Sequence, residues 1–472
     1  MSQGHRFHPT LLREYDLRGV VGKTLVEADA VALGRALAVH VGQQPEARAL
    51  KRPLRFCVGR DGRLSSPSLH KALVDSIAAS GVDVIDIGLG PTPMLYFAVH
   101  AMNADAGAMV TGSHNAPEYN GFKLCAAKAR PIYGEAIRTL GAIAAEGAAT
   151  SGKGHVDGFD LRGRYVARLR EGLPAALEQP LKVGWDPGNG AAGEVLARLV
   201  ATLPGEHIVL NGTIDGRFPA HHPDPTIPEN LSQLIETVRA KRLDLGIAFD
   251  GDGDRIGVVD ERGRIVWGDQ LVALLARDVI ARHGAARPII LDIKSSAACT
   301  EHIERSLKGT PMLWRTGHSL IKAKMAETGA PLAGEMSGHI FFADGYYGFD
   351  DALYAAVRLL ALLGAAKRSL ASLVDELPRY VSTPELRIDC PDERKFDVMR
   401  HVEAKLRADG ASLLDIDGVR VSTVDGWWLL RASNTQPALV ARAEARTADG
   451  LDRLKSALSR ALGDAGLSAP RF

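Results

Sequence analysis

Three segments of the chain repeat one layout: a proline, a short apolar run, and then polar and small residues ahead of a segment with helical character. The three segments begin at Pro53, Pro180 and Pro288. A short apolar run bounded in this way indicates a buried strand, and a strand followed by a loop and a helix is the building unit of an α/β sheet. The repetition therefore predicts three related α/β domains.

The rest of the chain calls for a further domain, because 472 residues exceed what one hydrophobic core serves, and length alone favours roughly three or four domains. After Pro378 the pattern changes to a charged helix over 395–407 and short strands at 418–422 and 427–430, which predicts a smaller α+β domain. Linkers are expected at 147–154, 260–268 and 375–378. The predicted domains cover residues 1–156, 157–264, 265–377 and 378–472.

The composition limits which partners the protein can bind and in which compartment it is expected. The net charge is +1, which gives no general attraction to nucleic acid or to an acidic membrane. No apolar run approaches the roughly 20 residues of a membrane span, and the first residues lack a signal-peptide pattern, so we expect a cytoplasmic protein. The cysteines lack CxxC spacing and are expected to be reduced core thiols. They are Cys57, Cys125, Cys299 and Cys390.

The stretch 111–123 places a serine where chemistry is expected. Ser113 follows the apolar run 106–110, so it lies just past the carboxyl end of a predicted strand, which is where open α/β sheets bind ligands. For an isolated segment, a turn built from Ser, His and Asn near Pro and Gly is the alternative.

A run of alternating aspartates follows the apolar segment 243–249. Residues 250–255 read Asp-Gly-Asp-Gly-Asp-Arg, and the glycines let the backbone curl so that all three carboxylates face one point, as a hard cation requires. A solvated turn would gain nothing from the mutual repulsion of these carboxylates. An EF-hand loop also fails, because Arg255 stands where that loop needs glycine and the flanks indicate strands.

Two more polar loops follow in the third and fourth predicted domains. Residues 334–339 offer the carboxylate of Glu335, the hydroxyl of Ser337 and the imidazole of His339, a set suited to sugar hydroxyls. The loop that begins at Arg431 combines a guanidinium with hydroxyls, an amide and backbone N–H groups, which suits a phosphate. Each could alone be an ordinary loop, but the four constellations together supply a phosphoryl carrier, a metal, sugar contacts and a phosphate anchor.

With these motifs in this order, the chain resembles the α-D-phosphohexomutases, and within them the bacterial phosphomannomutase/phosphoglucomutase type. The resemblance covers the whole chain. It rests on residues 14–19, 61–67, 111–123, 250–255, 317–322 and 334–339 and on the loop that begins at Arg431. It implies four domains around a central cleft, three of mixed α/β type and a fourth that is α+β and TATA-binding-protein-like.

The resemblance implies an activity and its cofactors. Ser113 would be carried as phosphoserine, and Mg²⁺ would be held by Asp250, Asp252, Asp254 and a phosphoserine oxygen, with Arg255 helping to offset the phosphoryl charge. Transfer to a hexose phosphate would give a hexose 1,6-bisphosphate, which serves as intermediate and activator. The net reaction would interconvert the 1-phosphates and 6-phosphates of mannose, glucose or both.

The resemblance also assigns roles within the site. Lys123 and His339 would transfer protons, with Arg18 and His114 assisting, and which of them is acid and which base stays open. The substrate would be bound by Tyr15, Arg18, Arg255, Lys294, His318, Glu335, Ser337, His339, Arg431, Ser433, Asn434 and Thr435. Glu335 and Ser337 would read the sugar 3- and 4-hydroxyls, and closure of the fourth domain would require a hinge near 375–378.

Several alternatives stay open. A phosphoglucosamine-type mutase shares the chemistry and differs in the sugar. An aspartyl-phosphate sugar phosphatase would use Asp250 as nucleophile, although the threonine of the haloacid dehalogenase loop is missing. A serine hydrolase at Ser113 lacks the GxSxG elbow, and a sugar-phosphate or metal-binding module without turnover is the non-enzymatic option. We expect small-molecule hexose phosphates as partners, no nucleic acid or membrane, and a monomer with a weak homodimer as the alternative.

Overall fold

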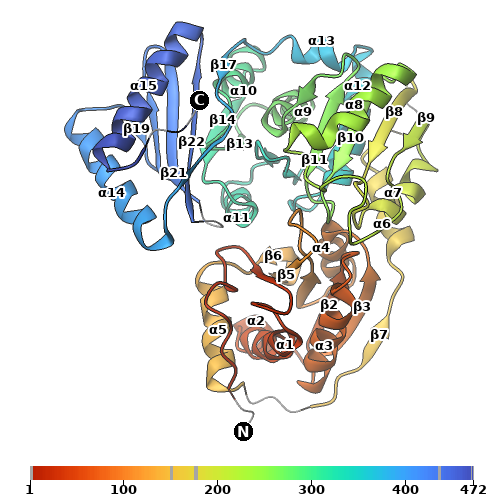
Figure 1. Cartoon of the computed structure of the whole chain (residues 1–472). Helices are drawn as coiled ribbons and strands as arrows, with labels where there is room; N and C mark the ends of the chain where they lie inside the picture. The colour runs from red at the N-terminus through yellow and green to blue at the C-terminus, as the bar shows by residue number, and fades with distance from the viewer. Residues whose placement is uncertain (1–3, 149–151, 175–178, 434–436, 469, 471) are drawn as a thin grey trace.

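The computed structural model describes residues 4–148, 152–174, 179–433, 437–468, 470 and 472. Its strands form four separate sheets, each made from a consecutive part of the chain. We call the parts around these sheets domains I to IV, and Figure 1 shows them in colour order from red to blue. Within the described ranges, no helix combines the length and apolar character needed to cross a lipid bilayer.

Domain I is a mixed sheet between two layers of helices. Its strand order is β1-β5-β4-β2-β3-β7, with β6 paired to β5, and β2 runs parallel to both β3 and β4. Helices α1, α3 and α5 pack on one face, and α4 packs on the other. The elements are β1 (Leu17–Val20), α1 (Glu27–Gly42), α2 (Pro45–Arg48), β2 (Arg55–Arg60), α3 (Ser66–Ala79), β3 (Asp83–Leu89), α4 (Thr92–Ala101), β4 (Ala106–Val110), β5 (Tyr119–Ala126), β6 (Arg130–Pro131), α5 (Glu135–Glu146) and β7 (Val156–Gly158).

Domains II and III repeat the arrangement on smaller sheets, with orders β12-β11-β10-β8-β9 and β14-β13-β15-β16. Domain II contains α6 (Arg162–Arg170), β8 (Leu181–Asp186), α7 (Gly193–Val200), β9 (Gly205–Val209), α8 (Ser232–Lys241), β10 (Leu245–Phe249), β11 (Ile256–Asp260) and β12 (Ile265–Val266). Domain III contains α9 (Gly268–His283), β13 (Pro288–Asp292), α10 (Ala297–Glu301), β14 (Thr310–Trp314), α11 (His318–Thr328), β15 (Leu332–Gly334), β16 (Ile340–Phe342), α12 (Ala352–Ala366) and α13 (Leu370–Val374). The three related α/β domains predicted from the sequence are confirmed.

Residues 260–268, expected to be a linker, form an ordered connection between the sheets of domains II and III. They form a turn in which the amide of Asp260 donates to the carbonyl of Arg264, and β12 then pairs with β11. The chain passes directly from β12 into α9. A two-residue strand is too short for hydrophobic periodicity to reveal.

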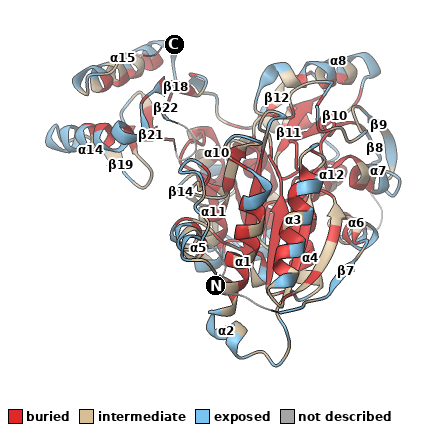
Figure 2. Cartoon of the chain, turned by 60° about the horizontal axis from the view of Figure 1, so that its bottom comes forward, coloured by how far each residue is buried: buried red, intermediate tan, exposed pale blue. Residues whose placement is uncertain are grey.

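Domain IV is an antiparallel sheet covered by two helices, as expected for an α+β domain. The strand order is β17-β22-β21-β20-β19, and β18 pairs with β22. Figure 2 shows α14 and α15 together at one side of the molecule. The elements are β17 (Val381–Ser382), β18 (Leu386–Asp389), α14 (Asp392–Ala408), β19 (Leu413–Leu414), β20 (Val419–Ser422), β21 (Gly426–Ala432), β22 (Ala438–Ala445) and α15 (Ala448–Asp464).

The hydrophobic cores connect the domains unequally. One continuous core joins the first three domains and includes Met94 of domain I, Trp185 of domain II and Leu353 of domain III. Domain IV has a core of its own, built around residues such as Leu430 and Leu458. All four cysteines are buried and unbridged, which confirms the prediction of core thiols.

Domain IV meets domain III mainly through polar groups. The ammonium of Lys294 lies 3.0 Å from the carboxylate of Glu385. The guanidinium of Arg420 donates to the carbonyl of Ile293 at 2.6 Å, and Glu444 accepts from the amide of Ala297 at 2.7 Å. The apolar part of the joint is small and consists of Ile293, Trp427 and Leu429 with two partly buried neighbours.

Candidate active site

Ser113 lies immediately after β4, at the carboxyl end of a central strand, as the sequence predicts. Its φ of 49° falls in the left-handed region, which is uncommon for a residue with a side chain. The hydroxyl is buried, 3.2 Å from Oδ2 of Asp250 and 3.2 Å from Nδ1 of His114. The loop therefore presents the serine to the aspartate run of domain II.

Arg63 fixes the backbone of the Ser113 loop, a role that the sequence did not reveal. Its guanidinium is fully buried, and Nε lies 3.2 Å from Oδ2 of Asp61. A side chain at Gly112 would collide with Arg63, so only glycine fits beneath it. The terminal nitrogens donate to the carbonyls of Ser113 (2.7 Å), Asn115 (2.5 Å), Ala116 (2.6 Å) and Tyr119 (3.0 Å).

The three aspartates of the β10–β11 turn converge as predicted. Asp250, Asp252 and Asp254 are fully buried, and each offers an oxygen within 4.8 Å of the others. Burial and the two neighbouring carboxylates raise the pKa of Asp250 well above its usual range. Among the described residues, Oδ1 of Asp252 and Oδ1 of Asp254 find no hydrogen-bond donor. Buried carboxylate oxygens without donors, grouped around one point, fit a hard divalent cation.

Lys123, on β5, faces the same aspartates from domain I. Its ammonium lies 2.8 Å from Oδ2 of Asp252 and also bonds Asp254. Burial alone would lower its pKa, but the charges of these carboxylates raise it. The ammonium bonds the Oδ2 atoms of Asp252 and Asp254 and leaves the Oδ1 atoms of the same carboxylates without a donor in the described part of the chain.

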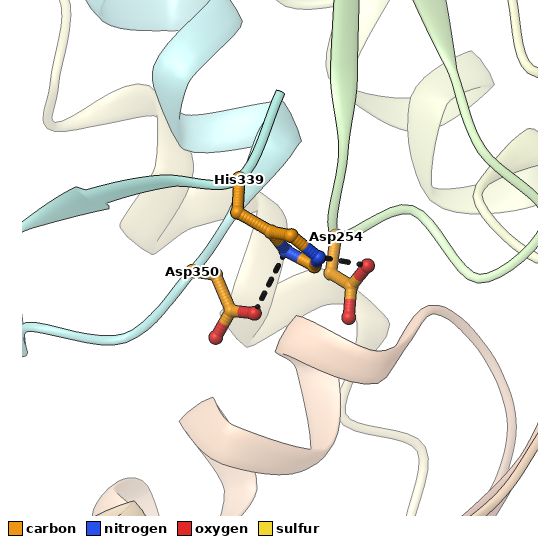
Figure 3. A group of neighbouring side chains, drawn as sticks. All are labelled: Asp254, His339 and Asp350. Carbon is orange, nitrogen blue, oxygen red and sulfur yellow. Dashed lines mark ion pairs between the residues drawn. The ribbon is translucent and has the colours of Figure 1, made fainter. Parts of the chain in front are cut away.

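His339 lies where domains II and III meet (Figure 3). Its Nδ1 is 3.1 Å from Oδ2 of Asp350 and 3.7 Å from Oδ1 of Asp254. Its Nε2 accepts from Nε of Arg255 at 3.0 Å. Because a guanidinium only donates, the proton of the neutral imidazole is assigned to Nδ1, on the side of Asp350.

Asp350 is a second residue that the sequence reasoning missed. It is fully buried and receives the ammonium of Lys322 at 2.9 Å on its other oxygen. Burial opposes ionisation, but the Lys322 charge holds the pKa of Asp350 well below its usual range. The available signal was a pair of acids, Asp350 and Asp351, directly ahead of the apolar segment that forms α12.

Aromatic and cationic side chains surround this centre. His318 stacks on His339 with ring centroids 5.5 Å apart, and Tyr15 lies 5.9 Å from His318 and donates to the carbonyl of Thr316. Burial lowers the pKa of His318 and of His114. Arg18 bonds Asp16 and the side-chain oxygen of Asn115 at the edge of the Ser113 loop.

The predicted sugar loop follows β15. Oε1 of Glu335 accepts from the amide of Gly317 at 2.5 Å, and Oε2 accepts from the hydroxyl of Ser337 at 3.0 Å. The amide of Met336 donates to Asp292 at 3.1 Å. Glu335 is thereby held beside the turn that carries His318.

The predicted phosphate loop belongs to domain IV. Nε of Arg431 lies 3.0 Å from Oδ2 of Asp417, and the same oxygen accepts from the amide of Thr316 in domain III at 3.1 Å. Asp417 thus links the loop to domain III. Ser433 is buried, whereas Asn434 and Thr435 lie outside the described residues.

Comparison with known proteins finds matches to one enzyme family over nearly the whole chain. Four family profiles match in order, described as phosphoglucomutase/phosphomannomutase alpha/beta/alpha domains I, II and III and the C-terminal domain. They match residues 9–150, 163–263, 267–380 and 385–461. The chain belongs to the phosphoglucomutase/phosphomannomutase family.

Individual members of the family are close in sequence and in fold. A phosphomannomutase/phosphoglucomutase of Pseudomonas aeruginosa is 42% identical over 464 residues, which cover 98% of this chain and 97% of the relative. A phosphoglucomutase of Neisseria gonorrhoeae is 40% identical, with 94% of this chain and 95% of the relative covered. The crystal structure of a family member from Burkholderia thailandensis superposes with a TM-score of 0.90 at 41% identity, covering 99% of this chain and 100% of that chain.

In this family member most of the predicted residues form one connected centre, with two further residues beside it. Contacts run from Ser113 to Asp250, from Lys123 to Asp252 and Asp254, and from Arg255 through His339 to His318 and Tyr15. Lys294 and Arg431 lie instead at the joint between domains III and IV. The residues expected to carry out the chemistry and two of those expected to bind the substrate thus lie on different parts of the molecule.

Proposed function

We propose that this enzyme interconverts hexose 1-phosphates and hexose 6-phosphates of glucose, mannose or both, through a phosphoserine at Ser113. The observation that carries the proposal is the position of the Ser113 hydroxyl, 3.2 Å from Asp250 within a buried carboxylate triad. The names of the relatives support the substrate class, since they are phosphomannomutases and phosphoglucomutases.

In the first half-reaction, a free hydroxyl of the sugar phosphate attacks the phosphorus on Ser113. The new P–O bond forms as the P–O bond to the serine breaks, and the sugar hydroxyl proton passes to a base, giving hexose 1,6-bisphosphate. Lys123 and His339 are the candidates for proton transfer. Bound Mg²⁺, held by Asp250, Asp252 and Asp254, would supply positive charge that offsets the phosphoryl oxygens.

In the second half-reaction, the bisphosphate turns around and its other phosphate returns to Ser113. The released sugar then carries its phosphate at the opposite position. For both orientations to react, the distal phosphate must be held by one anchor, and Arg431 with Ser433 of domain IV would be this anchor, which the guanidinium group of Arg431 supports. The polar joint of domain IV with domain III supports a closing motion about residues 375–378.

The sugar would be read by Glu335 and Ser337 through its 3- and 4-hydroxyls. With position 2 unread, the epimers glucose and mannose are both accepted. The second candidate is a phosphoglucosamine-type mutase, which has the same phosphoryl chemistry. Met336, which lies between the two reading residues, matches the dual-specificity version of this loop and favours the first candidate.

The deciding experiment is a comparison of kcat/KM for the 1-phosphates of glucose, mannose and N-acetylglucosamine, with Mg²⁺ and a trace of glucose 1,6-bisphosphate. We expect turnover of the first two and little of the third. Phosphate on the isolated enzyme should be acid-stable and map to Ser113. Hydroxylamine-labile phosphate would instead support an aspartyl-phosphate phosphatase. If no sugar phosphate were interconverted, the protein would be a binding module without turnover.

A further inference from the structure

A cavity of about 600 Å³ lies between domains I and III, and one of its lining residues, Lys322, also pairs with Asp350 beside the centre described above. None of the residues assigned to the reaction lines it. One wall comes from the turn leading into β6 of domain I, and the other from α11 and the segments next to β15 and β16 of domain III. Its volume is within the range of roughly 300–1,000 Å³ that is usual for small-molecule sites.

The lysines and arginines that line the cavity give it positive charge. Lys128, Arg130, Arg287 and Lys322 line it together with His283, and no aspartate or glutamate is among the described residues that do so. His283 and Lys322 are paired with Asp344 and Asp350. For the other three, no carboxylate of the described chain lies within ion-pairing distance, so their charges are free to attract an anion.

The floor of the cavity is apolar and partly aromatic. Met325, Ala330, Pro331 and Phe349 contribute buried apolar surface, and the rings of Tyr133 and Tyr347 also line the space. Such a floor offers few partners for the hydroxyls of a sugar. It suits a flat, weakly polar group, which would stack or pack against the rings.

The backbone beneath two of these cations adopts an unusual conformation. Lys128 and Ala129 are consecutive left-handed residues with φ of 59° and 52°, although neither is glycine. This conformation costs free energy, and such strain is found disproportionately where a segment serves binding. Here it forms the turn that brings Lys128 and Arg130 to the rim on either side of the buried Ala129.

We propose that this cavity binds a nucleoside phosphate. The guanidinium groups of Arg130 and Arg287 and the ammonium of Lys128 would bind the phosphate, since arginine matches phosphate geometry with paired N–H donors. The base would lie on the floor formed by Met325, Ala330 and the aromatic rings. The site is separate from the one that binds hexose phosphate.

The test is calorimetric titration of the full-length enzyme with each of the four ribonucleoside 5′-monophosphates, with saturating glucose 6-phosphate present to occupy the reaction centre. We expect at least one nucleotide to bind. Binding should weaken by at least about tenfold in the double variant Arg130→Ala and Arg287→Ala, whose side chains are exposed. The matched control is Arg305→Ala, an exposed arginine of domain III outside the cavity, which should bind like the wild type.

A second variant tests the floor without changing charge. Ala326→Trp, at an exposed position on α11 that lines the cavity, should weaken nucleotide binding by a similar factor. Three results would overturn the proposal. They are no binding of any nucleotide to the wild type, binding that is seen only in a parallel titration without glucose 6-phosphate, and inorganic phosphate binding as tightly as the nucleotide, because the floor would then contribute nothing.

Discussion

Domains I to III share one continuous hydrophobic core, whereas domain IV has its own core and is joined to domain III by ion pairs and hydrogen bonds. Domains I to III carry Ser113, the aspartate triad and His339. Domain IV carries Arg431 and Ser433. Close-packed apolar contacts tolerate little displacement. The polar contacts of the joint are also largely buried, with Arg420 and Glu444 6% and 2% exposed, but their groups can form hydrogen bonds with water when the domains part.

This difference matches what each part must do in the proposed reaction. Phosphoryl transfer requires the serine, the metal ligands and the proton carriers to stay in fixed relation, because small misplacements slow the chemistry severely. Substrate entry and reorientation require the phosphate anchor to move. We therefore expect substitutions in domains I to III to abolish the chemical step or destabilise the shared core. Substitutions in domain IV should weaken substrate binding or the contact with domain III.

The largest expected effect is on the chemistry held by domains I to III. Ser113→Ala removes the phosphate carrier, so kcat should fall by about a thousandfold or more while sugar phosphate still binds. Steady-state kinetics and calorimetry measure the two quantities. Ser68→Ala, an exposed serine on α3, is the control. Loss of binding along with turnover would mean that Ser113 has a structural role.

The shared core gives the next largest effect. Leu353→Ala truncates a fully buried side chain of that core and should lower the free energy of unfolding by about 2–5 kcal/mol. Hydrogen exchange should show loss of protection in domains I, II and III together. The matched substitution Leu458→Ala, in the core of domain IV, should reduce protection in domain IV alone. If each substitution reduced protection equally in all four domains, the molecule would not have two separate cores.

The anchor of domain IV should affect binding more than chemistry. Arg431→Ala removes a guanidinium from the phosphate loop, so KM should rise by roughly tenfold to a hundredfold with a smaller change in kcat. Arg431→Lys keeps the charge without the paired donors and should give an intermediate KM. Arg453→Ala, an exposed arginine on α15, should leave both constants unchanged. A fall in kcat at unchanged KM would place Arg431 in the chemical step instead.

The joint itself should give the smallest effect. Glu385→Gln removes the charge that faces Lys294, and because the two side chains are only 25% and 10% exposed, the loss should cost about 1–2 kcal/mol, seen as faster hydrogen exchange at the joint. The Lys294 charge lowers the pKa of Glu385, so the pair stabilises the joint above the ordinary carboxyl pKa, and this contribution is lost as pH falls through the lowered value. Variant and wild type should therefore converge in acid. Glu403→Gln on α14 is the control, and a difference that persists in acid would exclude the ion pair as its cause.

Much of the fold was predictable because its central strands are buried on both faces. The apolar run 106–110 is β4 with the same bounds, and the run 243–249 contains β10. The aspartate triad was equally predictable, because its three carboxylates lie within five residues on one turn. Local patterns of this kind need no knowledge of tertiary contacts.

Arg63 and Asp350 were missed because their partners are distant in the sequence. Arg63 bonds carbonyls about fifty residues later, and Asp350 faces His339 and Lys322 from a separate loop. Most arginines and aspartates are exposed, and the sequence alone does not reveal which of them are buried against distant partners. Asp417 was missed for the same reason, since it joins Thr316 of domain III to Arg431.

The side chain of Arg63 binds the main-chain carbonyls of the Ser113 loop and makes no bond to the serine hydroxyl. A loop fixed in this way keeps its shape whether its hydroxyl is free or esterified. In the proposed cycle the serine gains and loses a charge of nearly two units at each turnover. The backbone would stay unchanged through that cycle, so the empty and the loaded carrier would present the same geometry to the next sugar.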